Sequence, residues 1–249
     1  MDADYLVGAF TAFLRTKMSL LQVRVGLERS PESRSLGWAL NFPGAFAYGK
    51  NDAEALEKLR ESLIIFEHWI GQHSDKNWLQ LTEFKLQVEE SVDTFVPNEY
   101  NTVTSFFEDD RRPLETVEIE RVLQIHRWQR QDLLAGVKNL RPEMMTRMLP
   151  GERWNINGIL NHIGRTEVLY LSFLELPLPT AELLVHNPFK ILEFSYALVQ
   201  KTLPSLAGNT AVLDQDGELW SARKLVRRLL WHQRDHIEHI QQIVEMANQ

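Results

Sequence analysis

Residues 21–28 read Leu-Gln-Val-Arg-Val-Gly-Leu-Glu, and every second side chain of this stretch is a large apolar one. Because successive side chains of a β-strand point to opposite faces, the pattern predicts a strand that is buried on one side. A second alternation over residues 38–42 ends at the turn-forming pair Pro43-Gly44, and residues 45–48 can form a short third strand. The chain therefore begins its regular structure with a small sheet.

A helix with clear ends follows these strands. Asn51 is a good N-cap, and Glu54 can reach back to the backbone, as in a capping box. Apolar residues recur at helical spacing up to Ile70, and Gly71 stands where a C-terminal cap belongs. Residues 84–89 alternate again and predict a last strand. The order of these elements predicts an α+β unit, in which one helix packs on one face of a small sheet.

The stretch from Gly37 to Leu56, with its Pro-Gly turn and its capped Asn-Asp-Ala-Glu-Ala helix start, resembles the HicB-like antitoxin fold. The similarity covers roughly residues 20–92, and we assign residues 19–95 to this domain. HicB antitoxins usually carry a DNA-binding helix–turn–helix or ribbon–helix–helix tail, and neither pattern follows here. The resemblance thus implies an interaction or scaffold module more than a repressor.

The pattern changes after this domain. Residues 96–113 hold two prolines, an acidic pair and a basic pair, which predicts a linker with at most one partly ordered turn. Residues 1–18, before the domain, are either a leader read from an upstream start codon or a short amphipathic helix. From residue 114 to 249 the apolar period is 3.6, which predicts helices.

Four long helices are expected in this second part. They should cover residues 114–140, 156–174, 188–203 and 222 to near the C-terminus. Loops at 141–154 and 204–220 would join them, so the sequence predicts an all-α four-helix bundle after the α+β domain.

The composition of the chain excludes several kinds of active site and partner. The 249 residues include no cysteine, which excludes a thiolate nucleophile, cysteine-bound zinc and an iron–sulfur cluster. A net charge of −7 argues against nucleic acid as a partner, because binding phosphates requires a basic face. The acidic excess belongs to residues 1–108, with 16 acidic against 10 basic side chains.

No apolar run is long enough for a membrane span, and Asp2 and Asp4 do not suit a secretory signal, so we expect a cytoplasmic protein.

Three of the eight histidines stand out. His232 and His236 are four residues apart, so on a helix they share one face and can reach the same ion. His162 lies on another helix of the same expected bundle. If three imidazoles bind a divalent ion, coordination positions stay open for water or substrate, as in catalytic sites. The alternative is that these histidines are hydrogen-bonded core residues, which are also common. Gln233 stands where the metalloprotease pattern His-Glu-x-x-His has its general base, so a metalloprotease is disfavoured.

Two stretches carry a second resemblance. Residues 153–167, Arg-Trp-Asn-Ile-Asn-Gly-Ile-Leu-Asn-His-Ile-Gly-Arg-Thr-Glu, are similar to the Trp-Ser-x-x-x-x-Leu-x-His-x-x-x-x-Glu motif of DinB-like (DinB/YfiT) proteins. Residues 219–236 are similar to the last helix of that family, with its His-x-x-x-His pair. The resemblance implies a four-helix bundle, often dimeric, with a divalent metal on His162, His232 and His236. Gln233 replaces the Glu that is frequent at that place in the family.

The neighbours of these histidines have two interpretations each. His239 is either a fourth ligand or a core histidine, and we favour the core, as we do for His126. Glu167 and Asp235 can orient a ligand imidazole, or they can be exposed helix charges or partners of an arginine.

Aromatic and basic residues nearby are expected to be structural. Trp154 and Trp220 precede helix caps, where such residues staple helix ends. A group of arginines on the last helix can attract an anionic substrate, but a solvated face is the favoured interpretation. The group consists of Arg223, Arg227, Arg228 and Arg234.

These observations lead to three hypotheses of function. The first is a metal-dependent transferase or hydrolase acting on a small molecule, with Zn or Ni as first choice of metal and Fe or Mn as further candidates. Several DinB-like proteins are similar to thiol-dependent transferases, and a chain without cysteine would need an external low-molecular-weight thiol. The second is a non-catalytic regulatory protein whose HicB-like module binds a partner, and the third is a toxin–antitoxin component. A homodimer is compatible with each.

Overall fold

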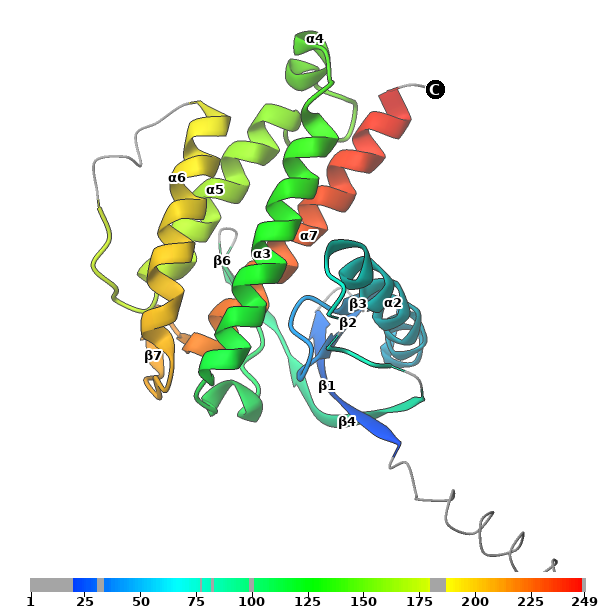
Figure 1. Ribbon diagram of the computed structural model, residues 1–249, viewed down its shortest axis with the longest axis vertical. Coiled ribbons are helices and arrows are strands. Elements are labelled where there is room, and N and C mark those ends of the chain that lie inside the picture. Colours follow the sequence, from blue (N-terminus) through cyan, green and yellow to red (C-terminus); the bar gives the residue numbers. More distant parts are fainter. Residues whose placement is uncertain are drawn as a thin grey trace, which may run out of the picture.

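The structure is a computed structural model, and it describes residues 20–30, 34–76, 78–81, 83–98, 101–179 and 187–247. Figure 1 shows a small sheet with one helix, formed by the first part of the chain, beside a second part that is mostly helical. The leader or short helix expected over residues 1–18 lies outside the described residues.

The sheet is mixed, with strand order β3-β2-β1-β4. Its strands are β1 (Leu21–Ser30), β2 (Arg34–Ala39), β3 (Phe46–Gly49) and β4 (Phe84–Asp93). Strand β1 runs antiparallel to β2 and parallel to β4, and β2 runs antiparallel to β3. The first, third and last predicted strands are confirmed. The second ends three residues earlier than predicted, because Phe42 N–H donates to the Ala39 carbonyl and already closes the turn.

Helix α2 (Asp52–His73) covers one face of the sheet with its buried apolar residues, as predicted. Asn51 caps it by accepting a hydrogen bond from Glu54 N, and Glu54 in turn accepts one from the Lys50 backbone. The predicted end at Gly71 is wrong, since the helix continues to His73 and Ser74 N–H donates to the carbonyl of Ile70. Gly49 is required where β3 meets α2, because a Cβ there would lie 2.2 Å from the Ala55 nitrogen.

The second part contains four long helices close to the predicted positions, and Figure 1 shows them running side by side. They are α3 (Thr116–Val137), α5 (Ile156–Ser172), α6 (Pro188–Thr202) and α7 (Ala222–Ala247). The expected loops contain short elements that the sequence analysis did not find. These are α4 (Pro142–Thr146), the 3-10 turn η3 (Leu203–Leu206), and the hairpin of β7 (Leu213–Gln215) and β8 (Glu218–Trp220).

The segment expected to be a linker is packed between the two parts. It contains β5 (Phe95–Asn98), β6 (Asn101–Val103) and the 3-10 turn η1 (Glu108–Arg111). Phe107 is fully buried, and its ring lies so close to Gly26 that a Cβ there would be only 2.7 Å from it. Asp110 is also buried and pairs with Arg227 of α7 at 2.6 Å. The end of this segment therefore forms part of the protein core and is not an exposed linker.

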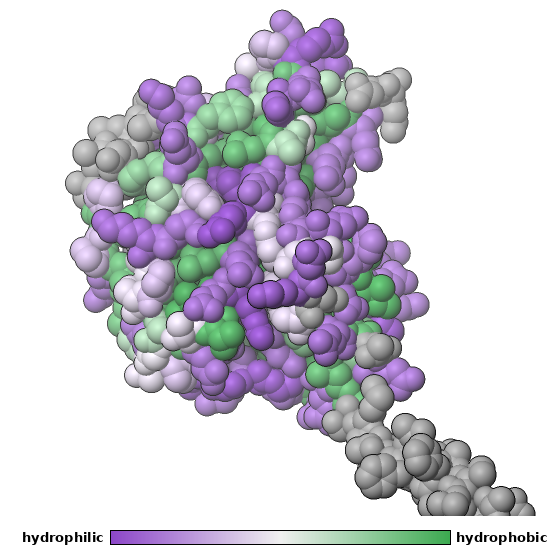
Figure 2. All heavy atoms as spheres, in the orientation of Figure 1, coloured by the Kyte–Doolittle hydropathy of each residue, from purple (hydrophilic) through white to green (hydrophobic). Residues whose placement is uncertain are grey.

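One apolar core runs through both parts of the molecule. It joins Val25 of β1 and Leu59 of α2 to Ile125 of α3, Val168 of α5 and Leu229 of α7. A second cluster fills the far end of the helices. Hydrophilic side chains cover most of the face drawn in Figure 2, and apolar patches show between them. Within the described residues no helix combines the length and the apolar character that crossing a bilayer requires.

Candidate metal centre

Two capped helices bring the three predicted histidines together. Asn155 caps α5 by accepting a hydrogen bond from Gly158 N at 2.9 Å, and this fixes the register that turns His162 inward. Helix α7 carries His232 and His236 one turn apart, on the side that faces α5. The predicted helices and the predicted pairing of their histidines are therefore found in the structure.

The ring nitrogens of the three histidines converge. Nε2 of His162 lies 3.0 Å from Nε2 of His232. One nitrogen from each of the three rings can be chosen so that all lie within 4.8 Å of one another. A tetrahedral zinc ion, with Zn–N bonds of about 2.0–2.1 Å, would need nitrogen pairs about 3.4 Å apart, and the observed spacing brackets that value. The histidines thus form a group that can hold a metal ion.

The electrostatics favour neutral rings, which is the form that binds metal. Burial, followed by the neighbouring His236 and His162, holds the pKa of His232 well below its usual range. Burial and then His162 lower the pKa of His236 to about 3. The pKa of His162 is lowered by burial and by Arg153. Near neutral pH all three imidazoles therefore offer lone pairs.

The hydrogen bonding of the candidate site is incomplete within the described residues, which is compatible with a metal-binding role. Nδ1 of His236 is buried and has no hydrogen-bond partner among the described residues. The Nδ1 atom of His162 lies 3.4 Å from the Thr166 hydroxyl, which can orient the ring from behind. A buried imidazole nitrogen without a partner is costly unless a ligand satisfies it. Three imidazole nitrogens as ligands suit Zn, Ni, Fe or Cu.

The loop before α5 covers the outer side of the histidines. Trp154 stacks on His162 with ring centroids 4.5 Å apart, and the Arg153 guanidinium lies 4.5 Å above the Trp154 ring. Trp154, predicted as a helix staple, therefore also fixes the ring of a candidate ligand. His239 pairs with Glu152 at 2.7 Å and so fastens the same loop to α7. His239 Nε2 is therefore engaged with Glu152, and His239 does not belong to the group of histidines whose nitrogens lie within 4.8 Å of one another.

A second polar cluster lies on the other side of the same helices. Glu167, only 1% exposed, accepts two hydrogen bonds from Arg130 and one from Ser195, and it lies 3.0 Å from His126 Nε2. Arg130 also donates to the Gln233 side chain. His126 is thus a core histidine, as expected, and Glu167 is the partner of an arginine. Gln233 points into this cluster, away from the three metal-binding candidates.

The arginines of α7 contradict the predicted solvated face. Arg223, Arg227 and Arg228 are 4%, 4% and 7% exposed, and Lys224 between them is fully buried. Each of the four cations lies beside an acidic residue. The pairs are Arg223–Glu118, Lys224–Glu218, Arg227–Asp110 and Arg228–Glu28. The physical reason is that the sheet and the segment before α3 cover this part of α7.

The sheet also reaches the neighbourhood of the histidines, which the sequence analysis missed. Trp231 Nε1 donates to the Tyr48 hydroxyl at 2.9 Å, and that hydroxyl donates to Asp235 at 3.1 Å. Tyr170 of α5 lies against His232, with ring centroids 5.8 Å apart. For Tyr48 no local signal was available, because 183 residues separate it from Trp231.

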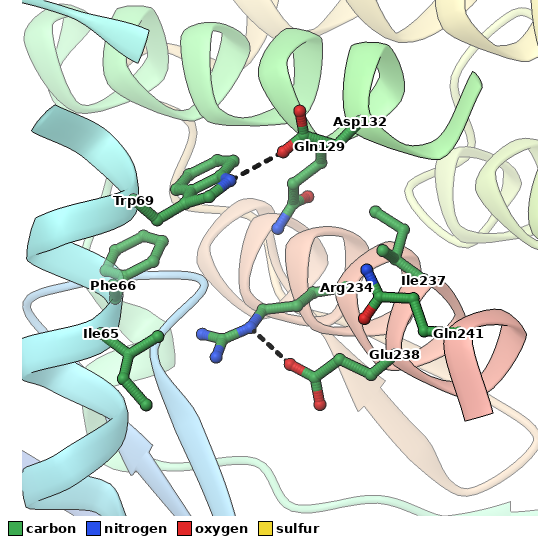
Figure 3. A pocket seen from close by; sticks show the side chains of 9 residues that line it. All are labelled: Ile65, Phe66, Trp69, Gln129, Asp132, Arg234, Ile237, Glu238 and Gln241. Carbon is green, nitrogen blue, oxygen red and sulfur yellow. Dashed lines mark hydrogen bonds and ion pairs between the residues drawn. The ribbon is translucent and has the colours of Figure 1, made fainter. Parts of the chain in front are cut away.

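A pocket of about 250 Å³ lies on the opposite side of α7. Figure 3 shows Phe66 and Trp69 of α2, Asp132 of α3, and Arg234 and Ile237 of α7 around it. Trp69 Nε1 donates to Asp132 at 2.7 Å across its edge. None of the three candidate ligands lines this pocket, so it is separate from the metal centre.

Comparisons with protein-family models, with curated proteins and with solved structures found no match to this chain.

Proposed function

We propose that the chain is a divalent-metal protein of the DinB-like type, whose helical part is a four-helix bundle with the ion on His162, His232 and His236. The observation that carries this proposal is the convergence of three neutral imidazoles, one of which has a buried nitrogen without a partner among the residues described. A structural core would pair such groups, as the neighbouring Glu167 cluster does. The proposed activity is a thiol transfer or a hydrolysis on a small molecule.

The chemistry follows from the ligand set. A bound divalent ion would supply Lewis acidity, which lowers the pKa of a thiol or a water at the open position. The protein contributes orientation, since Trp154 and Thr166 fix the His162 ring from two sides. Because the sequence contains no cysteine, the thiol of a transfer reaction comes from an external low-molecular-weight compound.

Metal analysis of protein purified without a histidine tag tests the proposal. We expect about one transition-metal ion per chain in the wild type and loss of that ion in His232→Ala. His239→Ala is the matched control, because His239 lies on the same helix but pairs with Glu152. Less than about 0.3 equivalents in the wild type, or an unchanged content in His232→Ala, would contradict the proposal.

Turnover assays then separate the activities. Metal-loaded protein is assayed with a thiol plus an electrophile, and in parallel with ester and amide substrates. Turnover that requires His232 in either series supports the enzyme. Full metal occupancy without any turnover favours the regulatory hypothesis.

A further inference from the structure

Arg228 differs from every other buried cation of α7 in its hydrogen bonding. It is 7% exposed, yet its Nε has no hydrogen-bond partner among the described residues. Its ion-pair distance to Glu28 is 3.8 Å, which is beyond hydrogen-bond range. Arg227, the next residue back, donates from all three of its nitrogens to Asp110 and Ser105. The buried Nε of Arg228 therefore has no acceptor among the described residues.

The contacts of Arg228 fix the position of its guanidinium but leave its Nε without an acceptor among the described residues. Its guanidinium lies 4.0 Å from the centre of the Trp231 ring and 5.6 Å from that of Trp38. Glu28, the nearest counter-ion, directs its Oε2 atom to Trp38 Nε1 and to the Ser105 hydroxyl. Ring faces and a distant carboxylate balance the charge of Arg228, but they accept few of its five N–H groups.

Arg228 lies one helical turn before the candidate metal ligand His232. Residues four apart share a helix face, and the rise between them is roughly 6 Å. Tyr170 connects the two positions, because its ring lies against His232 and its hydroxyl is a hydrogen-bond partner of Arg228. Along α5 and α7, the guanidinium of Arg228 and the phenol of Tyr170 thus lie next to the imidazole of His232.

The charges around the triad favour an anion. Three neutral imidazoles would leave both positive charges of a divalent ion uncompensated by ligands. The nearby carboxylates already have partners: Asp235 accepts from Tyr48, Glu152 pairs with His239, and Glu167 pairs with Arg130. A molecule that binds here is therefore expected to bring its own negative charge.

We propose that Arg228, together with the Tyr170 hydroxyl, binds the carboxylate of a small substrate whose other end reaches the metal on the three histidines. The inference rests on the proposed function and names its substrate class: a short carboxylic acid that carries a thiol or an oxygen donor a few bonds from the carboxylate. Such a carboxylate would supply the acceptor that Nε of Arg228 lacks among the described residues, in a charge-assisted and bidentate form.

The test compares two thiols of equal length on cobalt-loaded protein. The probes are 3-mercaptopropionate and 3-mercaptopropanol, and the readout is the thiolate-to-cobalt absorption band during a titration. We expect the carboxylate thiol to bind about tenfold more tightly or better, as a hydrogen-bonded charge pair in a buried site provides. Comparing the ratio of the two dissociation constants between variants cancels the intrinsic difference between the thiols.

The variants are chosen so that the protein keeps its fold. Arg228→Gln alone would leave Glu28 as an uncompensated buried charge, so it is combined with Glu28→Gln. Tyr170→Phe removes only the hydroxyl. Arg234→Gln is the control, because it removes an arginine from the same helix at the separate pocket. We expect the ratio to fall to about one in the double variant, to fall in part in Tyr170→Phe, and to stay unchanged in Arg234→Gln.

The same samples separate this inference from the proposed function. Cobalt that binds and is lost in His232→Ala, with a thiol ratio that depends on Arg228, supports both. Cobalt that binds with equal affinity for the two thiols, or with a ratio that the Arg228 variant does not change, overturns the carboxylate site and leaves the metal site standing. Failure to bind cobalt at all overturns both.

Discussion

Helices α5 and α7 carry two polar clusters. Their residues are neighbours in the sequence, but the two clusters differ in charge and in hydrogen bonding. The first contains Glu167 and Gln233 with their partners, and every one of its charges is hydrogen-bonded inside the protein. The second contains His162, His232 and His236, which are held neutral and include a buried nitrogen that has no partner in the part of the chain that the structure describes. Glu167 follows Thr166, which supports His162, and Gln233 follows His232 directly.

From this difference we expect the two clusters to contribute unequally to the stability of the fold. A buried ion pair that has lost one partner is strongly destabilising, so the Glu167 cluster must remain complete for the helices to pack. The histidine cluster is held by ring contacts and one His162–His232 hydrogen bond, and it contains no ion pair among the described residues. Groups that fit a ligand better than they fit each other are typical of functional sites, where stability is given up for binding.

The largest expected effect comes from breaking the complete cluster. In the wild type, one guanidinium nitrogen of Arg130 donates a hydrogen bond to each carboxylate oxygen of Glu167. Arg130→Met removes this cation and leaves the negative charge of the buried Glu167 carboxylate uncompensated. We expect the free energy of unfolding to fall by about 3–5 kcal/mol, measured by urea denaturation of metal-free protein. The double variant Arg130→Met/Glu167→Met, which removes both charges, should recover most of this loss. A loss below about 1 kcal/mol in the single variant would contradict the structural role.

Acid should weaken the same cluster by a somewhat smaller amount. Burial by itself raises the pKa of Glu167, but the charges of Arg130 and His126 with the hydrogen bonds outweigh it and lower the pKa to about 2. Since the folded pKa lies below the unfolded value of 4.5, the stabilisation is complete above pH 4.5 and is lost as the pH falls toward 2. The full span corresponds to about 3 kcal/mol.

Denaturation curves between pH 5 and the lowest pH at which the protein stays folded measure this dependence. The slope of stability against pH should be smaller in Glu167→Gln than in the wild type, because the variant lacks the titrating group. Slopes are compared instead of absolute values, since Gln at this position also leaves Arg130 without its counter-ion. Equal slopes would show that Glu167 does not account for the acid sensitivity.

The sequence predicted the parts of this picture that local rules determine. Helices α3, α5, α6 and α7 were found because caps and apolar spacing act within a few residues, as Asn155 illustrates. His232 and His236 followed from their spacing on one helix, and His162 was added by the expectation of a shared bundle and by family resemblance. The order of the predicted strands and helix was enough to predict the small sheet with its single helix.

What failed depended on contacts between distant segments. Arg227 and Arg228 were expected in solvent, because nothing near them in the sequence shows that Asp110 and Glu28 cover them. Gln233 was compared with a metalloprotease base, whereas it hydrogen-bonds to Arg130 in the core. Helix geometry could have given this result, since adjacent residues point about 100° apart and His232 already faces the other two candidate ligands.

The smallest stability effect should come from the histidine cluster, together with complete loss of metal binding. His236→Leu replaces an imidazole with an unpaired buried nitrogen by an apolar side chain. In metal-free protein we expect the free energy of unfolding to stay the same or to rise by up to about 1 kcal/mol, because a desolvation cost disappears while no internal hydrogen bond to this nitrogen is lost. In the wild type, added metal should raise the melting temperature, and in His236→Leu the same metal should have no effect. A destabilisation of more than about 2 kcal/mol without metal would place His236 with Glu167 among the groups that the fold requires.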